Sequence, residues 1–148
     1  MIIGVPKEIM PGERRVAASP ETTAKMVQDG LTVLIEKNAG EGAFYHDEDY
    51  VAAGAQIVED VTDIFQKSDV ILKVKEPLFN QDKGKHEVDM MHEGQTLITF
   101  IHPAAPSNHD MVKHMAAQGV TSITLDGIPR ITRAQVMDAL TSMSTCAG

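Results

Sequence analysis

Positively charged and imidazole side chains follow four separate apolar runs in this sequence. Each stands where an apolar run gives way to polar residues, so each would lie at the carboxyl end of a strand. In a parallel α/β sheet, ligands gather outside those strand ends. The set therefore favours binding of an anion such as a carboxylate, a phosphate or a pyrophosphate. Its members are Arg14, Arg15, Lys73, Lys75, His102 and Arg130.

Each of these side chains also has a structural explanation. Arg15 lies in a polar loop, where an arginine is usually only solvated, and Lys75 at a strand end can extend its amine to the surface. His102 precedes a proline and suits a packed turn. Their convergence on one edge favours a ligand site, but it does not identify the reaction.

The strands expected to carry these residues are short apolar runs separated by helix-like segments. Most runs do not alternate strictly between apolar and polar residues, as expected for strands buried on both faces. We therefore predict an α/β fold, with a mainly parallel sheet flanked by helices in a Rossmann-like or flavodoxin-like topology. The expected strands are Ile2–Val5, Leu31–Glu36, Asp69–Val74, Thr96–Ile101 and Val120–Leu125.

Helix-starting and helix-ending residues mark the segments between the strands. Ser19, Pro20 and Glu21 combine a cap residue, a first-turn proline and an early acid, and Gly30 follows as a stop. Three further helices are expected by the same criteria. They run from Asp47, as cap, to about Gly54, from Asp60 to Ser68, and from Ser107 or Asn108 to Gly119.

The segment from Asn80 to Glu93 is polar, charged and weakly patterned, and we interpret it as a surface excursion between strands. His86 and His92 lie in it, and His109 lies downstream. Their spacing matches no zinc signature, and the only cysteine is far along the chain. We expect structural or solvent-exposed roles for these histidines and no metal site.

The final segment, from Thr132 to Gly148, predicts a helix with its own start signal. Thr132 and Gln135 match a T-x-x-Q capping box, and Ile131 and Val136 occupy the two positions of a hydrophobic staple. Gln135 therefore has a structural role before any ligand is considered. We expect the segment to end at a boundary within a longer polypeptide.

Composition limits the classes of partner. The 148 residues suffice for one domain, residues 1–148, and the formal net charge is 13 − 21 = −8 with a pI near 5.1. This charge argues against nucleic acid as a partner. No apolar stretch is long enough for a membrane span, and the start lacks signal-peptide features, so no direct membrane insertion is expected. The single cysteine fits a reducing compartment, and the cytoplasm is the expected location.

A nucleotide-binding loop is not evident in these residues. Gly40, Glu41 and Gly42 invite comparison with the dinucleotide fingerprint, but Tyr45 occupies the third glycine position and no clean helix follows. No phosphate-binding P-loop and no nucleophile elbow is present either. We conclude that an NAD-binding Rossmann domain is absent from this chain.

Four ordered motifs resemble the opening of the alanine dehydrogenase and pyridine-nucleotide transhydrogenase superfamily, and the resemblance covers essentially the whole chain. A C-terminal motif, residues 129–135 continuing to residues 138–142, resembles the alpha subunit of the transhydrogenase branch. The resemblance implies the N-terminal domain of that superfamily. The four motifs are Ile3–Glu8, Gly12–Ala17, Asp49–Ala55 and Leu72–Pro77.

In the transhydrogenase branch, the C-terminal motif lies beside the nicotinamide of NAD(H), which is held mainly by the following Rossmann domain. The resemblance makes Gln135 and Asp138 the candidates closest to the chemistry. Val136 and Thr141 depart from the serines that the family often has, and only Thr141 keeps a hydroxyl. The implied cofactor-binding residues are Arg130, Ile131, Thr132, Arg133, Gln135, Asp138 and Thr141.

His102 matches a residue typical of the other branch of the superfamily, the alanine dehydrogenases. Alanine dehydrogenases carry a histidine here as the acid–base catalyst, beside an arginine and a lysine like Arg15 and Lys75 that bind the amino or keto acid. Many transhydrogenases lack this histidine. The sequence therefore combines the C-terminal motif of one branch with parts of the substrate site of the other.

The resemblance favours part of an oxidoreductase that transfers hydride between NAD(H) and NADP(H), coupled to proton movement by separate membrane segments. NADP would be bound by another subunit or domain. The expected partners are a Rossmann domain, other transhydrogenase subunits and further copies of the chain, located in the cytoplasm, peripheral to the inner membrane. The chain alone is not expected to complete a catalytic cycle. Two alternatives stay open: the substrate domain of an alanine dehydrogenase-like enzyme, and a non-catalytic module that binds a small anion or assembles with a partner.

Overall fold

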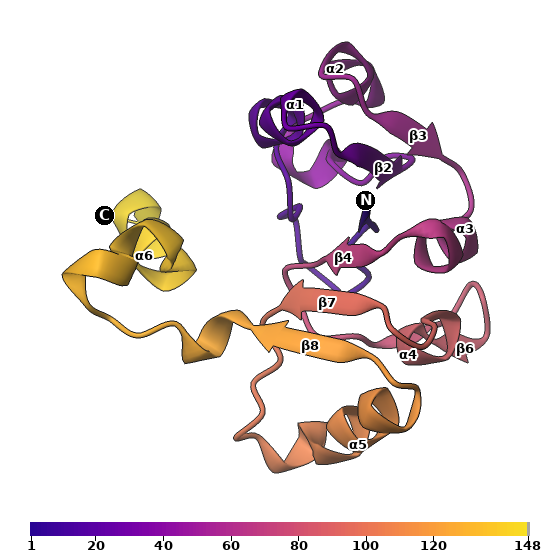
Figure 1. Ribbon diagram of the computed structural model, residues 1–148, viewed down its shortest axis with the longest axis vertical. Helices are drawn as coiled ribbons and strands as arrows, with labels where there is room; N and C mark the ends of the chain where they lie inside the picture. Colours follow the sequence, from indigo (N-terminus) through magenta and orange to yellow (C-terminus); the bar gives the residue numbers. More distant parts are fainter. Residues whose placement is uncertain (148) are drawn as a thin grey trace.

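Six strands form one parallel sheet at the centre of the computed structural model, which describes residues 1–147 (Figure 1). The strand order is β3-β2-β1-β4-β7-β8, and all neighbouring strands are parallel. This is the strand order of a doubly wound, Rossmann-type sheet. The predicted α/β fold with a mainly parallel sheet is thereby confirmed. The strands are β1 (Ile2–Val5), β2 (Thr32–Glu36), β3 (Gln56–Val58), β4 (Val70–Leu72), β7 (Thr96–Thr99) and β8 (Thr121–Thr124).

Helices cover both faces of the sheet. Val33 and Ile35 of β2 belong to a core shared with α1 and α2, whereas Leu34 belongs to a core shared with α3, α4 and α5. Because both faces of the strand are covered, its sequence shows no apolar–polar alternation. The helices are α1 (Pro20–Gln28), α2 (Asp47–Ala52), α3 (Val61–Lys67), α4 (Glu87–Met90), α5 (His109–Ala117) and α6 (Ala139–Ala147).

The expected helix starts are confirmed at α1 but differ at α2. The Ser19 hydroxyl accepts a hydrogen bond from the Thr22 backbone N–H, and Pro20 is the first helical residue. At α2, Asp47 is the first helical residue and not the cap. Its carboxylate instead accepts a hydrogen bond from the Asn38 backbone N–H at 2.9 Å. Asp47 therefore stabilises the preceding loop, so the expected cap was misplaced by one position.

Two other features of the sheet and its connections differ from expectation. The edge strand β3 was not predicted, because three residues are too short to display a period. Residues 80–93 are not a surface excursion. They contain a short hairpin of β5 (Phe79–Asn80) and β6 (Lys85–His86), followed by α4, whose Val88 and Met90 lie in the core. The few apolar side chains of this polar segment all point inward.

The start predicted for the helix from Thr132 to Gly148 is also wrong. Residues Thr132–Met137 form a 3₁₀ helix in which no side chain caps the start, and α6 begins only at Ala139. The proposed staple does not form, because Ile131 and Val136 are 56% and 95% exposed. Asp138 lies between the two helices. Its carboxylate accepts hydrogen bonds from backbone N–H groups in the first turn of α6 and so fixes where that helix begins. Gly148 lies outside the described residues.

A buried lysine joins three segments of the chain at the carboxyl end of the sheet. Lys73 follows β4, and its Nζ lies 3.0 Å from Glu87 Oε1 and 3.3 Å from Glu8 Oε2. Burial by itself lowers the pKa of Lys73, but Glu87 and Glu8 outweigh burial and raise it. The inclusion of Lys73 among the anion-binding residues was therefore wrong, because its side chain is fully buried between two carboxylates.

The same two carboxylates also bind backbone groups. Glu8 accepts hydrogen bonds from the backbone N–H groups of Val74, at 2.6 Å, and Lys75, at 3.3 Å. Glu87 accepts one from Leu78 at 2.8 Å. Burial raises the pKa of Glu8, and the nearby Lys73 ammonium opposes this rise. The carboxyl end of β4, the loop after β1 and α4 are thus held together by one buried cluster of Glu8, Lys73 and Glu87.

We predict that Lys73→Met destabilises the protein strongly. The change leaves Glu8 and Glu87 buried without their cation, and breaking a buried ion pair typically costs about 3–5 kcal/mol. Lys67→Met is the matched control, because Lys67 pairs with Asp63 on an exposed helix surface, where such pairs contribute less than about 1 kcal/mol. Urea unfolding measures both. Equal free energies of unfolding for the two variants would contradict the account.

Candidate functional site

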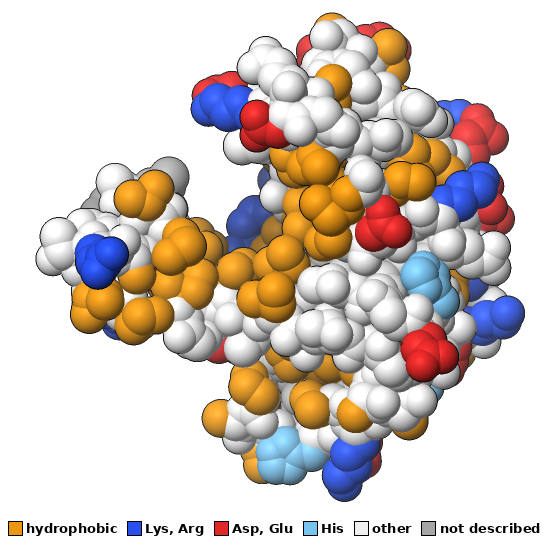
Figure 2. Space-filling view, viewed as in Figure 1, with side chains coloured by type: hydrophobic (Ala, Val, Ile, Leu, Met, Phe, Trp, Pro, Cys, Tyr) orange, Lys and Arg blue, Asp and Glu red, His pale blue; other side chains and the backbone are white. Residues whose placement is uncertain are grey.

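The segment that follows β8 stands apart from the rest of the molecule. Residues 128–147, here called the C-terminal arm, follow a short 3₁₀ turn (Leu125–Gly127) and contain the 3₁₀ helix Thr132–Met137 and α6. Figures 1 and 2 show the arm as a separate lobe beside the sheet domain. Large apolar side chains on this lobe are exposed. They are Ile131, Val136, Met137 and Leu140.

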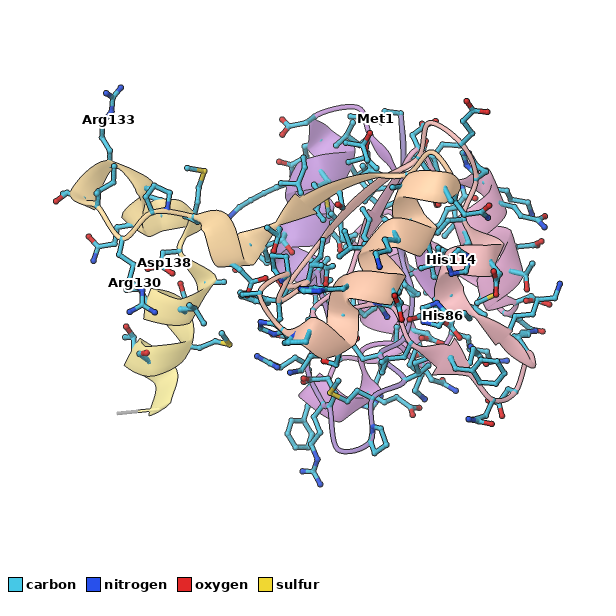
Figure 3. All side chains as sticks on the ribbon, turned by 90° about the horizontal axis from the view of Figure 1, so that it is seen from below. Met1, His86, His114, Arg130, Arg133 and Asp138 are labelled. Atoms are coloured by element: carbon cyan, nitrogen blue, oxygen red, sulfur yellow. The ribbon has the colours of Figure 1, made fainter. Side chains whose placement is uncertain are left out.

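The arm encloses a hollow of about 250 Å³. Six of the seven residues that the family resemblance implied as cofactor-binding come together around it, from the segment before the 3₁₀ helix, from that helix and from the start of α6. Arg133 is the exception, and Figure 3 shows its side chain directed away from Arg130 and Asp138. The residues that line the hollow are Arg130, Ile131, Thr132, Gln135, Asp138 and Thr141.

Asp138 is the buried polar centre of this hollow. Its Oδ1 accepts hydrogen bonds from the backbone N–H groups of Leu140, at 3.1 Å, and Thr141, at 3.3 Å. Its Oδ2 accepts one from the Thr141 hydroxyl. The Thr141 hydroxyl, followed by the backbone donors and the Arg130 charge, lowers the pKa of Asp138 despite burial. Asp138 is therefore an ionised acceptor fixed at the start of α6.

The other lining groups supply complementary chemistry. Gln135 lines the hollow and is exposed, and its side-chain amide makes no hydrogen bond to another described residue. Arg130 adds a cation, and Ile131 adds an apolar surface. A planar group with an amide substituent would find an acceptor, donors and an apolar wall here. The Thr141 hydroxyl that pairs with the Asp138 carboxylate belongs to the first turn of α6 and helps to fix the helix start, so the arrangement suits binding and orientation.

Arg15 lies on the body of the protein, opposite the arm, and is held by Glu13. Its Nε donates to Glu13 Oε1 at 2.8 Å, its Nη2 donates to Oε2, and its backbone N–H also donates to Oε1. The hydrogen bond from Arg15 lowers the pKa of Glu13 to about 2, with smaller contributions that include the charge of Lys75. Arg15 and Lys75 therefore both stabilise the ionised Glu13 carboxylate.

The backbone of Lys75 is fixed from two sides. Its N–H donates to Glu8, and its carbonyl oxygen accepts a hydrogen bond from the Thr99 hydroxyl at 2.9 Å. The cavity beside Arg15 is lined by Arg15 and Glu13 but not by Lys75. The sequence analysis missed Glu13 because its role depends on a side-chain contact and not on a motif of its own.

His102 belongs to a different hollow. Its backbone has a φ of 48°, which is uncommon for a residue other than glycine, and its ring stacks on Phe100 at 5.9 Å. The ring Nδ1 lies 2.7 Å from Asp126 Oδ1. The hollow around it has a volume of about 350 Å³ and shares no lining residue with the cavity beside Arg15 or the hollow of the arm. The predicted grouping of His102 with Arg15 and Lys75 is not formed as one cavity.

Asp126 organises this region and was not singled out as a site residue. Its Oδ2 accepts hydrogen bonds from the backbone N–H groups of Ile101 and His102 and from the Thr124 hydroxyl. Although burial raises the pKa of Asp126, these donors and His102 outweigh burial and lower it. The carboxylate is therefore ionised at neutral pH, and the Nδ1 of His102 carries the proton between them. This leaves Nε2 of His102 free.

The three histidines considered in the sequence either have structural contacts or are exposed. His86 Nδ1 accepts a hydrogen bond from the Val88 backbone N–H at the start of α4, and His92 contacts the carbonyl oxygen of Ser68. His109 is an exposed first residue of α5. Among residues 1–147, no group of three or more His, Cys, Asp and Glu side chains is placed to hold a metal ion. In the same residues, no helix has both the length and the apolar character needed to cross a bilayer.

The sequence of the chain matches a known family. The sequence profile described as "Alanine dehydrogenase/PNT, N-terminal domain" matches residues 4–147. The chain belongs to this family. As an alanine dehydrogenase/PNT N-terminal domain, it has relatives in both branches that its motifs resemble.

Relatives named as transhydrogenases and relatives named as alanine dehydrogenases are about equally similar in sequence to this chain. The chain is 38% identical to NAD(P) transhydrogenase subunit alpha of Cereibacter sphaeroides, of which it covers 27%. It is 37% identical to NAD(P) transhydrogenase subunit alpha of Haemophilus influenzae, covering 27%, and 39% identical to alanine dehydrogenase of Methanococcus maripaludis, covering 37%. All three matches extend over 148 residues of this chain. The alanine dehydrogenase/PNT N-terminal domain thus spans between a quarter and two-fifths of these relatives, and overall identity does not separate the branches.

Solved structures support the same assignment of the fold. The transhydrogenase from Sinorhizobium meliloti superposes with a TM-score of 0.87 and 34% identity, over 99% of this chain and 41% of that chain. An L-alanine dehydrogenase superposes with a TM-score of 0.79 and 37% identity, over 90% of this chain and 34% of that chain. The doubly wound sheet is therefore the fold of alanine dehydrogenase/PNT N-terminal domains.

We predict that Asp126→Asn loosens the turn at His102. Asparagine carries no charge, so its one remaining oxygen is a weaker acceptor for the N–H groups of Ile101 and His102, and these groups lose protection from hydrogen exchange. Because the folded pKa of Asp126 is lowered, its stabilising effect is present above its ordinary pKa of 3.8 and is lost as pH falls through the lowered value. Thermal unfolding across the acidic range should therefore depend less on pH in the variant. The exposed Asp29→Asn serves as control, and equal exchange rates in both variants would contradict the prediction.

Proposed function

We propose that this chain is the N-terminal domain of an NAD(P) transhydrogenase alpha subunit and that its arm positions the nicotinamide of NAD(H). The observation that carries the proposal is the hollow of the arm. It gathers six residues of the family-like motif around an ionised, buried Asp138. In the complete protein, these residues would orient NAD(H) for hydride transfer between NAD(H) and NADP(H).

The lining groups fit the carboxamide end of a nicotinamide. The Asp138 carboxylate can accept from the carboxamide NH₂, while Gln135 and Arg130 can donate to its oxygen. Ile131 offers an apolar surface for one face of the ring. When bound, NAD(H) supplies the transferable hydride, and the residues of this chain orient the ring and exclude water. Transfer between two nicotinamide rings needs no protein acid or base, only close approach of the rings and exclusion of water.

The proposal requires partners. No phosphate-binding glycine loop is evident in the sequence, so the rest of the dinucleotide would be held by a Rossmann domain, and NADP would be bound by another subunit or domain. We further propose additional copies of the chain as partners, and a cytoplasmic location at the membrane periphery through partner subunits. The names of the transhydrogenase relatives, which are subunits of larger proteins, support these partners.

A second candidate function is the substrate domain of an alanine dehydrogenase-like enzyme. One observation favours it: Asp126 orients His102 through Nδ1 and leaves Nε2 free, which is how a general acid–base histidine is held. In that case Arg15 and Lys75 would bind the carboxylate of an amino or keto acid. Because His102 lines a hollow separate from the cavity beside Arg15, we favour the transhydrogenase function.

We predict that Asp138→Asn in the complete protein lowers the rate of hydride transfer by about 10²-fold, the loss typical of a misplaced reacting group. The asparagine oxygen can still cap α6, so the melting temperature should change little. Arg130→Gln and Arg133→Gln form a matched pair, because the two arginines belong to the same motif but only Arg130 lines the hollow. Stopped-flow transfer rates should fall more for Arg130→Gln. Unchanged transfer in well-folded Asp138→Asn would remove the hollow from the mechanism.

We predict that His102→Gln retains most of the hydride-transfer rate. Transfer between nicotinamide rings delivers no proton at this position, and glutamine preserves much of the side-chain volume. In the alternative enzyme, loss of an acid–base group would reduce turnover by about 10²–10⁴-fold. The assays are NAD(H)–NADP(H) transfer and NADH oxidation dependent on pyruvate and ammonia. A hundredfold loss of turnover in a well-folded His102→Gln variant, together with NADH oxidation that depends on pyruvate and ammonia, would establish the alanine dehydrogenase-like function.

A further inference from the structure

Two histidine side chains from different elements lie side by side (Figure 3). His86 ends β6, His114 lies in the last turn of α5, and the centroids of their rings are 5.9 Å apart. Asp89 of α4 contacts both residues. Its Oδ1 lies 2.9 Å from His114 Nε2, and its Oδ2 accepts a hydrogen bond from the His86 backbone N–H at 3.2 Å. The start of α4 and the end of α5 are thus joined through Asp89.

His86 also caps the start of α4. Its Nδ1 accepts a hydrogen bond from the Val88 backbone N–H at 3.2 Å. An imidazole nitrogen accepts a hydrogen bond only while it is unprotonated, whereas both ring nitrogens of a protonated histidine are donors. The cap therefore requires a neutral His86 that carries its proton on Nε2. Serine or asparagine at a helix start keeps its acceptor at any pH, but a histidine loses it in the range where the ring titrates.

The surroundings of His86 oppose its protonation. Burial, the largest effect, and the charge of His114 lower the pKa of His86, and the Asp89 carboxylate works against them. Other charged groups of this region have partners of their own. Glu87 pairs with Lys73 in the buried cluster, Asp63 with Lys67 on α3, Asp110 with Lys113 on α5, and Asp60 with Lys83 of the hairpin.

The capped helix supplies Glu87 to the buried cluster. Glu87 directly follows His86, and its carboxylate binds the Lys73 ammonium and the Leu78 backbone N–H. Helix α4 has only four residues, Glu87–Met90, so the cap is a large share of the hydrogen bonding at its start. A change at His86 therefore reaches the cluster that holds the carboxyl end of β4.

We propose that His86 is an acid-sensitive cap, and that its protonation releases the start of α4 and loosens the contacts of Glu87 with Lys73 and Leu78. The neutral ring stabilises the domain at neutral and higher pH. Because the folded pKa of His86 is lowered from its ordinary 6.5, this contribution is lost as pH falls from 6.5 through the lowered value. A protonated His114 strengthens the response, because it places a second cation beside the ring. The proposal does not depend on the nicotinamide site.

The cap is tested by nuclear magnetic resonance on the 148-residue chain across the histidine range, from pH 8 to pH 5. The ring signals of His86 follow its titration. Amide hydrogen exchange, corrected for the intrinsic effect of pH, measures the protection of Val88 and Leu78. Both protections should fall about fivefold to tenfold along the His86 titration curve, the effect of losing a helix cap. The amides of α1, on the opposite face of the sheet, are the internal reference and should keep their protection.

Three variants complete the test. His86→Asn supplies a cap that does not titrate, so Val88 and Leu78 should have the same protection at both ends of the pH range. His109→Asn is the matched control, because His109 is exposed and lies at the other end of α5 from His114, and it should retain the wild-type response. His114→Gln removes the neighbouring charge and should move the His86 midpoint to higher pH.

Any of four results would overturn the acid-sensitive cap. His86 could titrate while Val88 keeps its protection, which would separate the ring from the helix start. Val88 could lose protection while Leu78 keeps it, which would confine the effect to the cap and spare Glu87. The same pH response in His86→Asn as in the wild-type chain would assign the response to another group. An unchanged His86 midpoint in His114→Gln would remove the second histidine from the device.

Discussion

The buried ammonium of Lys73 between Glu8 and Glu87 is the interaction on which the other regions of this domain depend. Removing three charges from water is costly, and the cost is offset only when their geometry and their other hydrogen bonds are satisfied. Glu8 meets this condition by binding the backbone at Val74 and Lys75, and Glu87 by binding the backbone at Leu78. The cluster therefore fixes the loop after β1, the end of β4 and the start of α4 in one arrangement.

This frame explains why the two candidate sites differ in kind. The cavity beside Arg15 lies on the fixed edge of the sheet, because its residue Glu8 belongs to the buried cluster and Glu13 immobilises Arg15. The hollow around Asp138 lies on the arm, which has its own internal hydrogen bonds and touches the body through Met143. A rigid edge suits recognition of a small charged group, whereas an arm that carries a preformed hollow suits adjustment toward a second domain.

Sequence patterns predicted the regular elements better than the contacts between them. The strands buried on both faces were recognisable from their apolar runs, whereas β3 was too short to show a period. The Thr132–Gln135 signal failed because Asp138, six residues after Thr132, captures the start of α6. Residues 80–93 were misinterpreted because Glu87 is counted as a surface charge until its pairing with Lys73 is known. The hollow residues were predicted by family resemblance, whereas Glu13 and Asp126 act through partners that no local pattern identifies.

The central claim is that the arm, and not the region around His102, lies against the nicotinamide ring. The most direct measurement is the set of nuclear Overhauser effects between the ring protons of bound NADH and methyl groups of this chain in the complete protein. The account predicts contacts to the methyl groups of Ile131 and Thr141, which line the hollow of the arm. Contacts to the methyl groups of Ala104 and Ala105, which line the hollow beside His102, with none to Ile131 or Thr141, would contradict it.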